Sequence, residues 1–169
     1  MTNISLNVAV VTISDTRNKD NDTSGKKLIE LIGLSSHQII DRAIVKDDIY
    51  AIRACLSVWI HDPSIQVIIT TGGTGLTGRD GTPEAIKPLL DKIIDGFAEY
   101  FRMLSIEEIG TSALQSRCLA GVSNGTFVFC LPGSTAACEL GWNKIIMPQL
   151  SSDTKPCNLV DLTQRLLEK

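Results

Sequence analysis

Short continuous apolar runs alternate along this chain with segments whose apolar residues recur at helical spacing. The β-branched runs predict buried strands over residues 6–13, 38–45, 67–71 and 126–131. Stripes with a repeat of about 3.6 residues, together with turn and cap residues, predict helices that start near residues 23, 48, 82, 97 and 135, and a terminal helix over 159–167. We therefore expect an α/β protein: a single-domain, three-layer, Rossmann-like fold over residues 1–169, with a mostly parallel central sheet flanked by helices.

The helix starts are marked by short polar side chains. Thr23 or Ser24 can cap the first helix, and Asp47 or Asp48 the second. The third helix is expected to have Thr82 as its N-cap and proline 83 at its first helical position, and proline 88 must kink or break it.

A glycine-rich loop follows the third strand and holds most of the chemical information in the chain. Gly72, Gly73 and Gly75, interleaved with Thr74, directly follow Thr71 at the end of the strand. Glycine lets the backbone turn sharply and approach a ligand closely. Because a helix begins shortly afterwards, free N–H groups and a positive helix end favour an anion such as phosphate at this loop.

Spacing excludes two familiar nucleotide-binding loops. No lysine lies between residues 72 and 84, so the loop is not a P-loop, and no Gly-x-Gly-x-x-Gly is followed by an acidic residue about 20 positions later. Arg79 and Asp80 instead stand between the glycines and the helix. A carboxylate beside a phosphate loop suits a bridging divalent cation, although Asp80 can also serve a local turn and Asp47 a helix cap.

The carboxyl ends of parallel strands meet at one edge of a sheet, and ligands bind there. In this chain that edge collects residues 14–15, the turn before Asp47, residues 72–80 and residues 132–134. We therefore expect polar, acidic and glycine-rich segments to converge at one site.

Composition narrows the function classes. A net charge of −3 without a basic patch argues against nucleic-acid binding. Every apolar run is interrupted before it reaches the length of a membrane span, and no basic segment leads into an apolar stretch at the N-terminus. The five scattered cysteines fit a reducing cytoplasm, and the two histidines lack the pattern of a histidine-activated nucleophile.

Two motifs in this chain resemble the signature of the MoaB/MogA family of molybdenum cofactor biosynthesis proteins: TTGGTG at residues 70–75 and RDGTPEA at residues 79–85. The likeness spans nearly the whole chain. Its supporting segments are DTSG at 22–25, VKDD at 45–48, residues 101–121, LPGST at 131–135 and KPCN at 155–158. Residues 134–135, the 108–115 stretch and the tail are most similar to the MoaB branch.

This resemblance implies a protein that binds molybdopterin and transfers an adenylyl group from Mg-ATP to its terminal phosphate, releasing pyrophosphate. It also implies a homo-oligomer, either a trimer or a hexamer of two trimers, with other cofactor-biosynthesis proteins as further partners. Asp47 and Asp80 match the family's functional aspartates, and Asp80 is the expected Mg²⁺ ligand. The expected binding residues are Thr71, Gly72, Gly73, Thr74, Gly75, Ser116, Arg117, Pro132, Gly133 and Ser134.

The chemistry agrees with these residue types. Adenylyl transfer needs positioning and charge neutralisation, which backbone N–H groups, Mg²⁺ and carboxylates supply, and the substrate phosphate is itself the nucleophile. Arg117 could hold the terminal phosphate of molybdopterin.

Two positions depart from the family pattern: Lys46 replaces a proline before the first aspartate, and Thr135 replaces the second proline of a Pro-Gly-x-Pro turn. They favour an alternative, a non-catalytic oligomeric carrier of the pterin. A nucleotide hydrolase on the same scaffold is a third hypothesis for the function, and a purely structural protein ranks last.

Overall fold

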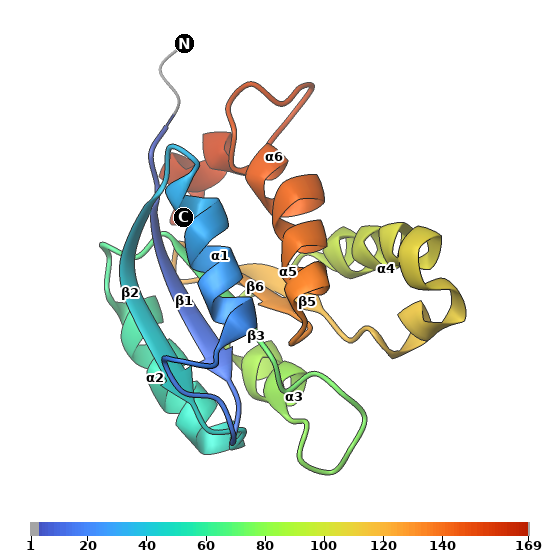
Figure 1. Cartoon of the computed structure of the whole chain (residues 1–169). Helices are drawn as coiled ribbons and strands as arrows, with labels where there is room; N and C mark the ends of the chain where they lie inside the picture. Colours follow the sequence, from blue (N-terminus) through green and yellow to red (C-terminus); the bar gives the residue numbers. More distant parts are fainter. Residues whose placement is uncertain (1–3, 169) are drawn as a thin grey trace.

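In the computed structural model, which describes residues 4–168, six strands form one sheet in the order β2-β1-β3-β6-β5-β4 (Figure 1). Residues 1–3, part of the segment in which no secretory signal was predicted, lie outside the described residues. The strands are β1 (Asn7–Ile13), β2 (Gln38–Val45), β3 (Val67–Thr71), β4 (Lys92–Ile93), β5 (Leu119–Ser123) and β6 (Thr126–Leu131). Strands β2, β1, β3 and β6 run parallel, whereas β5 is antiparallel to β6 and β4 is antiparallel to β5.

Helices cover both faces of this sheet, which confirms the predicted three layers. On one face lie α1 (Thr23–Gly33), α4 (Asp95–Ile109) and α5 (Thr135–Gly141), and α5 continues through a π-helical turn (Trp142–Ile146) into α6 (Met147–Gln149). The other face carries α2 (Ile49–His61) and the short α3 (Thr82–Ile86). Figure 1 shows α1 and α5 in front of the sheet and α2 behind it.

Side chains at alternate strand positions point to opposite faces of the sheet and pack into two separate hydrophobic cores. Val67 and Ile69 of β3 pack with α1, α4 and α5, whereas Ile68 packs against α2 and α3. β3 is buried at every position, and in the sequence it is a continuous run of β-branched residues. Among residues 4–168, no helix is long and apolar enough to cross a membrane.

The structure corrects the predicted N-cap of α1 and decides between the two residues predicted to cap α2. Asp22, and not Thr23 or Ser24, caps α1, because its carboxylate accepts a hydrogen bond from the N–H of Gly25 at 2.9 Å. Of the two candidates for α2, Asp48 is the cap and accepts from the N–H of Ala51 at 2.8 Å. The neighbouring Asp47 therefore does not cap α2.

The prediction for the third helix was wrong by one position. Gly81 is its N-cap, Thr82 is its first residue, and no side chain caps it. The N–H of Thr82 instead donates to the carbonyl of Gly73 at 2.9 Å, which ties the helix start to the glycine loop. The helix ends after five residues at Ile86, just before the 3₁₀ turn Lys87–Leu89 that contains Pro88. The predicted positive helix end is therefore that of a single short turn.

The region after α4 was the least predictable part of the chain. Residues 114–125 contain the end of a 3₁₀ helix (Gly110–Gln115) and the strand β5, which was not predicted. The short strand β4, which precedes α4, was not predicted either. The C-terminal segment forms a 3₁₀ helix (Val160–Arg165) in place of the expected α-helix. Because β5 runs antiparallel to β6, its first residue and not its last lies at the carboxyl edge of the parallel strands.

Candidate functional site

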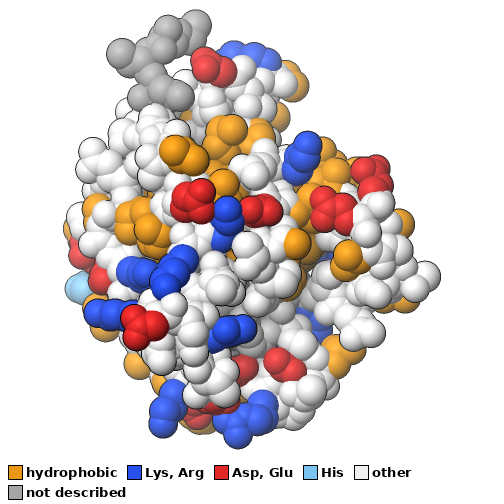
Figure 2. Space-filling model, viewed as in Figure 1, with side chains coloured by type: hydrophobic (Ala, Val, Ile, Leu, Met, Phe, Trp, Pro, Cys, Tyr) orange, Lys and Arg blue, Asp and Glu red, His pale blue; other side chains and the backbone are white. Residues whose placement is uncertain are grey.

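A cavity of about 590 Å³ opens at the carboxyl edge of the parallel strands. It is lined by Thr12, Ile13, Ser14, Asp15, Thr16, Arg17, Ser24, Asp47, Thr71, Gly72, Gly73, Arg79, Asp80 and Gly133. The predicted convergence at this edge is therefore confirmed for the segments after β1, β2, β3 and β6. In the space-filling view, basic and acidic side chains stand beside each other at this lower end of the molecule (Figure 2).

The glycine loop forms the floor of the cavity. Gly72 and Gly73 adopt positive φ values of 103° and 62°, a region that residues with a side chain rarely enter. A Cβ at position 73 would lie 2.2 Å from the hydroxyl oxygen of Thr82 and 2.6 Å from Oδ2 of Asp47. Glycine is thus required there both by conformation and by the close approach of two oxygen-bearing side chains.

Asp47 lies half-buried over this floor. Its Oδ1 accepts one long hydrogen bond, 3.3 Å from the backbone N–H of Gly81. Burial raises the pKa of Asp47, and the carboxylates of Asp80 and Asp15 raise it further, against the opposing effect of the Gly81 hydrogen bond. A carboxylate with so few partners keeps most of its oxygen lone pairs available for a ligand.

Asp80 lies on the opposite rim of the loop. Its Oδ2 accepts hydrogen bonds from both the N–H (2.9 Å) and the hydroxyl (2.5 Å) of Thr77, so the local turn role that the sequence left open is present. Hydrogen bonds from Thr77 are the main reason why the pKa of Asp80 is lowered, and the carboxylate stays ionised. The neighbouring Arg79 is exposed and pairs with Asp15 from the β1 turn.

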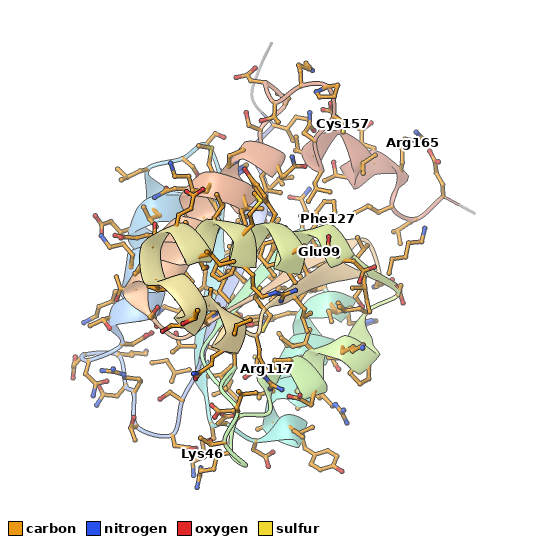
Figure 3. The ribbon with its side chains drawn as sticks, turned by 90° about the vertical axis from the view of Figure 1, so that its right-hand side faces the viewer. Lys46, Glu99, Arg117, Phe127, Cys157 and Arg165 are labelled. Carbon is orange, nitrogen blue, oxygen red and sulfur yellow. The ribbon has the colours of Figure 1, made fainter. Side chains whose placement is uncertain are left out.

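Arg117 lies beside the glycine loop but does not line the cavity. It forms a two-pronged ion pair with Glu84 of α3, at 2.6 and 2.8 Å, and its Nε donates to the carbonyl of Thr74 at 3.0 Å. In this arrangement the guanidinium holds the loop and α3 together. Ser116, next to it, terminates the 3₁₀ helix after α4 and does not line the cavity either. Figure 3 shows Arg117 and Lys46 at the same end of the molecule, away from Phe127 at the start of β6, and Lys46 is exposed there.

The turn after β6 supplies the facing wall. Gly133 lies so close to the glycine loop that a Cβ there would come within 2.9 Å of the Cα of Gly72. Thr71 donates its hydroxyl to the carbonyl of Pro132 at 3.1 Å, and Ser134 caps α5 by accepting from Ala137 at 3.1 Å. Of the predicted binding residues, Thr71, Gly72, Gly73 and Gly133 line the cavity, whereas Thr74, Gly75, Ser116, Arg117, Pro132 and Ser134 stand around it.

The thiol of Cys138, which lies beside this wall, is not activated as a nucleophile. Cys138 lies 3.2 Å from the hydroxyl of Thr71, but burial raises the pKa of its thiol to about 11. The group is therefore protonated at neutral pH, when it is a poor nucleophile.

Sequence reasoning missed the role of a third wall, formed by the segment after β1. Asp22 is fully buried and accepts from Thr12 and Arg42, each at 2.8 Å, in addition to its cap bond. Burial alone would raise the pKa of Asp22, but these hydrogen bonds outweigh it and lower the pKa. Its carboxylate thereby fixes the start of α1, and Ser24 of this first turn faces the cavity. The signal was the DTSG motif, in which an aspartate precedes the two hydroxyl residues.

Within the described part of the chain, no group of three or more His, Cys, Asp or Glu side chains could hold a metal ion. A cation in this cavity would take further oxygen ligands from hydroxyls, water or a bound phosphate, as Mg²⁺ commonly does. Asp47 and Asp80 are the acidic residues of the glycine-loop floor and rim that could contribute.

Comparison with known proteins agrees with this architecture. The sequence profile of the family described as "Probable molybdopterin binding domain" matches residues 9–152. Molybdenum cofactor biosynthesis protein B of Escherichia coli (strain K12) is 52% identical over 151 residues, which cover 89% of each chain.

Solved structures give the same result. A crystal structure of a molybdenum cofactor biosynthesis protein B is similar with a TM-score of 0.90 and 39% identity, covering 100% of both chains. The tungsten cofactor synthesizing protein MoaB from Pyrococcus furiosus has a TM-score of 0.76 at 36% identity, over 85% of this chain and 91% of that one. The chain therefore belongs to the MoaB/MogA family of molybdopterin-binding domains, as its motifs predicted.

Proposed function

We propose that this protein works in molybdenum cofactor biosynthesis, binds molybdopterin, and transfers AMP from Mg-ATP to the terminal phosphate of molybdopterin. One observation carries the proposal: two carboxylates, Asp47 and Asp80, flank a bare glycine backbone in a single open cavity. The names of the relatives support the pathway, and the family description supports the pterin ligand.

In this reaction an oxygen of the molybdopterin phosphate attacks the α-phosphorus of ATP. The bond between the α-phosphorus and its bridging oxygen to the β-phosphate breaks, and pyrophosphate leaves. The protein needs no covalent nucleophile, in agreement with the protonated thiol of Cys138. Mg²⁺, when bound, neutralises phosphate charge.

The chain's own groups position the reactants. The glycine loop lets phosphate oxygens approach the backbone without a side chain between them. Arg117 braces the loop through Thr74 and Glu84, and to meet the terminal phosphate of molybdopterin it has to exchange Glu84 for the ligand. The substrate phosphate would thus take the place of the Glu84 carboxylate in a strong bidentate pair with Arg117.

The test is an adenylation assay with purified protein, ATP, Mg²⁺ and molybdopterin, read as adenylated molybdopterin and pyrophosphate. We expect product from the unaltered protein and a loss of at least about 100-fold in Asp80→Asn, because the turn remains but the charge is lost. Undiminished turnover in that variant would refute the role of the carboxylate.

Asp62 provides a matched control. Its carboxylate accepts a hydrogen bond from the N–H of Ser64 at 2.8 Å, so like Asp80 it bonds to a nearby backbone N–H, but it does not line the cavity. Asp62→Asn should therefore keep full activity. Equal losses in both variants would point to a general effect on folding.

A non-catalytic carrier of the pterin is the second candidate, and Lys46 and Thr135 favour it because they stand where the family pattern has prolines. Tight molybdopterin binding without formation of pyrophosphate would decide for the carrier. Release of inorganic phosphate from ATP in the absence of pterin would instead identify a nucleotide hydrolase.

We also propose that the protein is a homo-oligomer. Large apolar side chains that α4 exposes to solvent support this: Tyr100, Met103, Ile106 and Ile109. Sedimentation equilibrium would distinguish a trimer from a hexamer, and a monomeric mass would exclude both.

A further inference from the structure

The hydroxyl of Thr82 stands out among the polar groups around the cavity. Thr82 is fully buried, and its oxygen has no hydrogen-bond partner. Burying a hydroxyl without a partner costs about 1–3 kcal/mol, so such groups are uncommon and call for an explanation.

The position of this hydroxyl indicates a partner from outside the chain. The point where a Cβ of residue 73 would stand lies 2.2 Å from the Thr82 hydroxyl oxygen, and 2.6 and 2.9 Å from the two carboxylate oxygens of Asp47. Three oxygens from two side chains therefore lie within 3 Å of one point beside the bare Cα of Gly73. Gly73 and Asp47, though not Thr82 itself, line the cavity, so a ligand would approach this point from their side.

The charges around this space favour a cation. Asp47 has one long hydrogen bond, from Gly81, and its ionisation is opposed by the nearby carboxylates of Asp15 and Asp80. Two cationic groups at the loop are already paired, Arg79 with Asp15 and Arg117 with Glu84, and Arg17, which also lines the cavity, donates to the carbonyl of Asn21 at 3.0 Å. An uncharged hydroxyl oxygen and a carboxylate are both ligands that small divalent cations accept.

We propose that Thr82, through its hydroxyl oxygen, and Asp47, through its carboxylate, are direct ligands of a Mg²⁺-type cation held above Gly73. This inference rests on the proposed use of Mg-ATP and assigns Thr82, which the family resemblance did not single out, to the cation. Water and phosphate oxygens complete the coordination shell, since Mg²⁺ keeps several waters and usually binds one or two carboxylates.

The experiment measures cation binding directly and does not depend on turnover. Mn²⁺, a paramagnetic substitute for Mg²⁺, is titrated into the full-length protein with and without ATP, and free Mn²⁺ is read by electron paramagnetic resonance. We expect Thr82→Val, which has the same shape, to weaken binding by at least about ten-fold, as the loss of groups that hold a metal site commonly does. Thr82→Ser keeps the hydroxyl and should bind within about three-fold of the unaltered protein, a difference of about 0.7 kcal/mol.

Thr70→Val is the matched control. Thr70 is as fully buried as Thr82 and its hydroxyl oxygen likewise has no hydrogen-bond partner, but it lies on β3 and not beside Asp47 and the Cβ position of Gly73, so its variant should bind Mn²⁺ normally. Thermal unfolding of each variant verifies that the fold is kept, and Thr82→Ser verifies that the effect belongs to the hydroxyl.

Two results would overturn the inference. Unchanged Mn²⁺ binding in Thr82→Val would show that the hydroxyl is not a ligand, and no Mn²⁺ binding by the unaltered protein, with or without ATP, would exclude the site. The outcome is separable from the proposed function. Weakened Mn²⁺ binding in Thr82→Val together with no adenylation by the unaltered protein would support the site and refute the enzyme.

Discussion

The turn after β3 and the turn after β6 both lead from a buried strand into a helix at the same edge of the sheet, and both carry hydroxyl residues at the helix start. After β6, Ser134 uses its hydroxyl to cap α5, and a π-helical turn and α6 extend that helix. After β3, Thr82 leaves its hydroxyl without a partner, and α3 ends after five residues.

The turn after β6 uses its hydroxyl to stabilise the fold, whereas the turn after β3 leaves a buried hydroxyl available to a ligand. The turn after β3 also contains two glycines with positive φ, and the carboxylate of the half-buried Asp47, which reaches this turn from the segment after β2, has a disfavoured ionisation. Such features cost stability and are typical of functional sites. The contrast can be tested by substitutions in the two turns.

The largest effect should come from Gly73→Ala. The added methyl would occupy the space between Thr82 and Asp47 and force a positive φ on alanine. Displacing reacting groups by about 1 Å can cost 100-fold in rate, so we expect at least about that loss in the adenylation assay. Gly78 lies in the same loop with nothing within 4 Å of a Cβ, and Gly78→Ala should retain activity. Equal activity of the two variants would contradict the assigned close approach.

The next effect compares the two hydroxyls in stability. Ser134→Ala removes a helix cap and should lower the free energy of unfolding by about 1 kcal/mol. Thr82→Val replaces a buried hydroxyl without a partner by a methyl of the same shape, and should leave stability unchanged or raise it. Urea denaturation of both variants measures the difference. A loss in Thr82→Val as large as that in Ser134→Ala would show that Thr82 has a structural partner.

The smallest effect concerns the charge of Asp47. Because burial and nearby carboxylates raise its pKa in the folded protein above the ordinary 3.8, the folded state holds the proton more tightly than the unfolded chain does. The resulting stability is complete below pH 3.8 and is lost as the pH rises through the folded-state value. Asp47→Asn should therefore raise stability at pH 7 by about 0.5 kcal/mol or less and change little at pH 3. Equal shifts at both pH values would show that the effect is not due to ionisation.

The sequence predicted the parallel half of the fold well for a physical reason. Strands such as Val67–Thr71 are buried on both faces and form continuous β-branched runs, and α2 has a regular apolar stripe that includes Ile52 and Leu56. The motif at 22–25, by contrast, offered three side chains able to cap a helix. The choice of Asp22 depends on Arg42, which reaches it from β2, and such a tertiary contact has no local signal.

The candidate site was predictable in its location and less so in its details. Topology places Asp47, Gly72 and Gly133 at one edge, as expected. The sequence could not show that Arg117 is engaged by Glu84, because the partners lie 33 positions apart. Nor could it distinguish the free hydroxyl of Thr82 from a capping one, since both begin a helix.

The reversed direction of β5 has a consequence for how mutations can change this site during evolution. Its start brings Ser116 and Arg117 to the glycine loop along a path that is independent of β1, β2 and β3. Mutations in residues 110–116 can therefore alter the surroundings of the loop, provided that Arg117, which holds the loop through Thr74, is kept. The segment beside the pocket can thus diversify in evolution, whereas the floor of the pocket is constrained by its glycines.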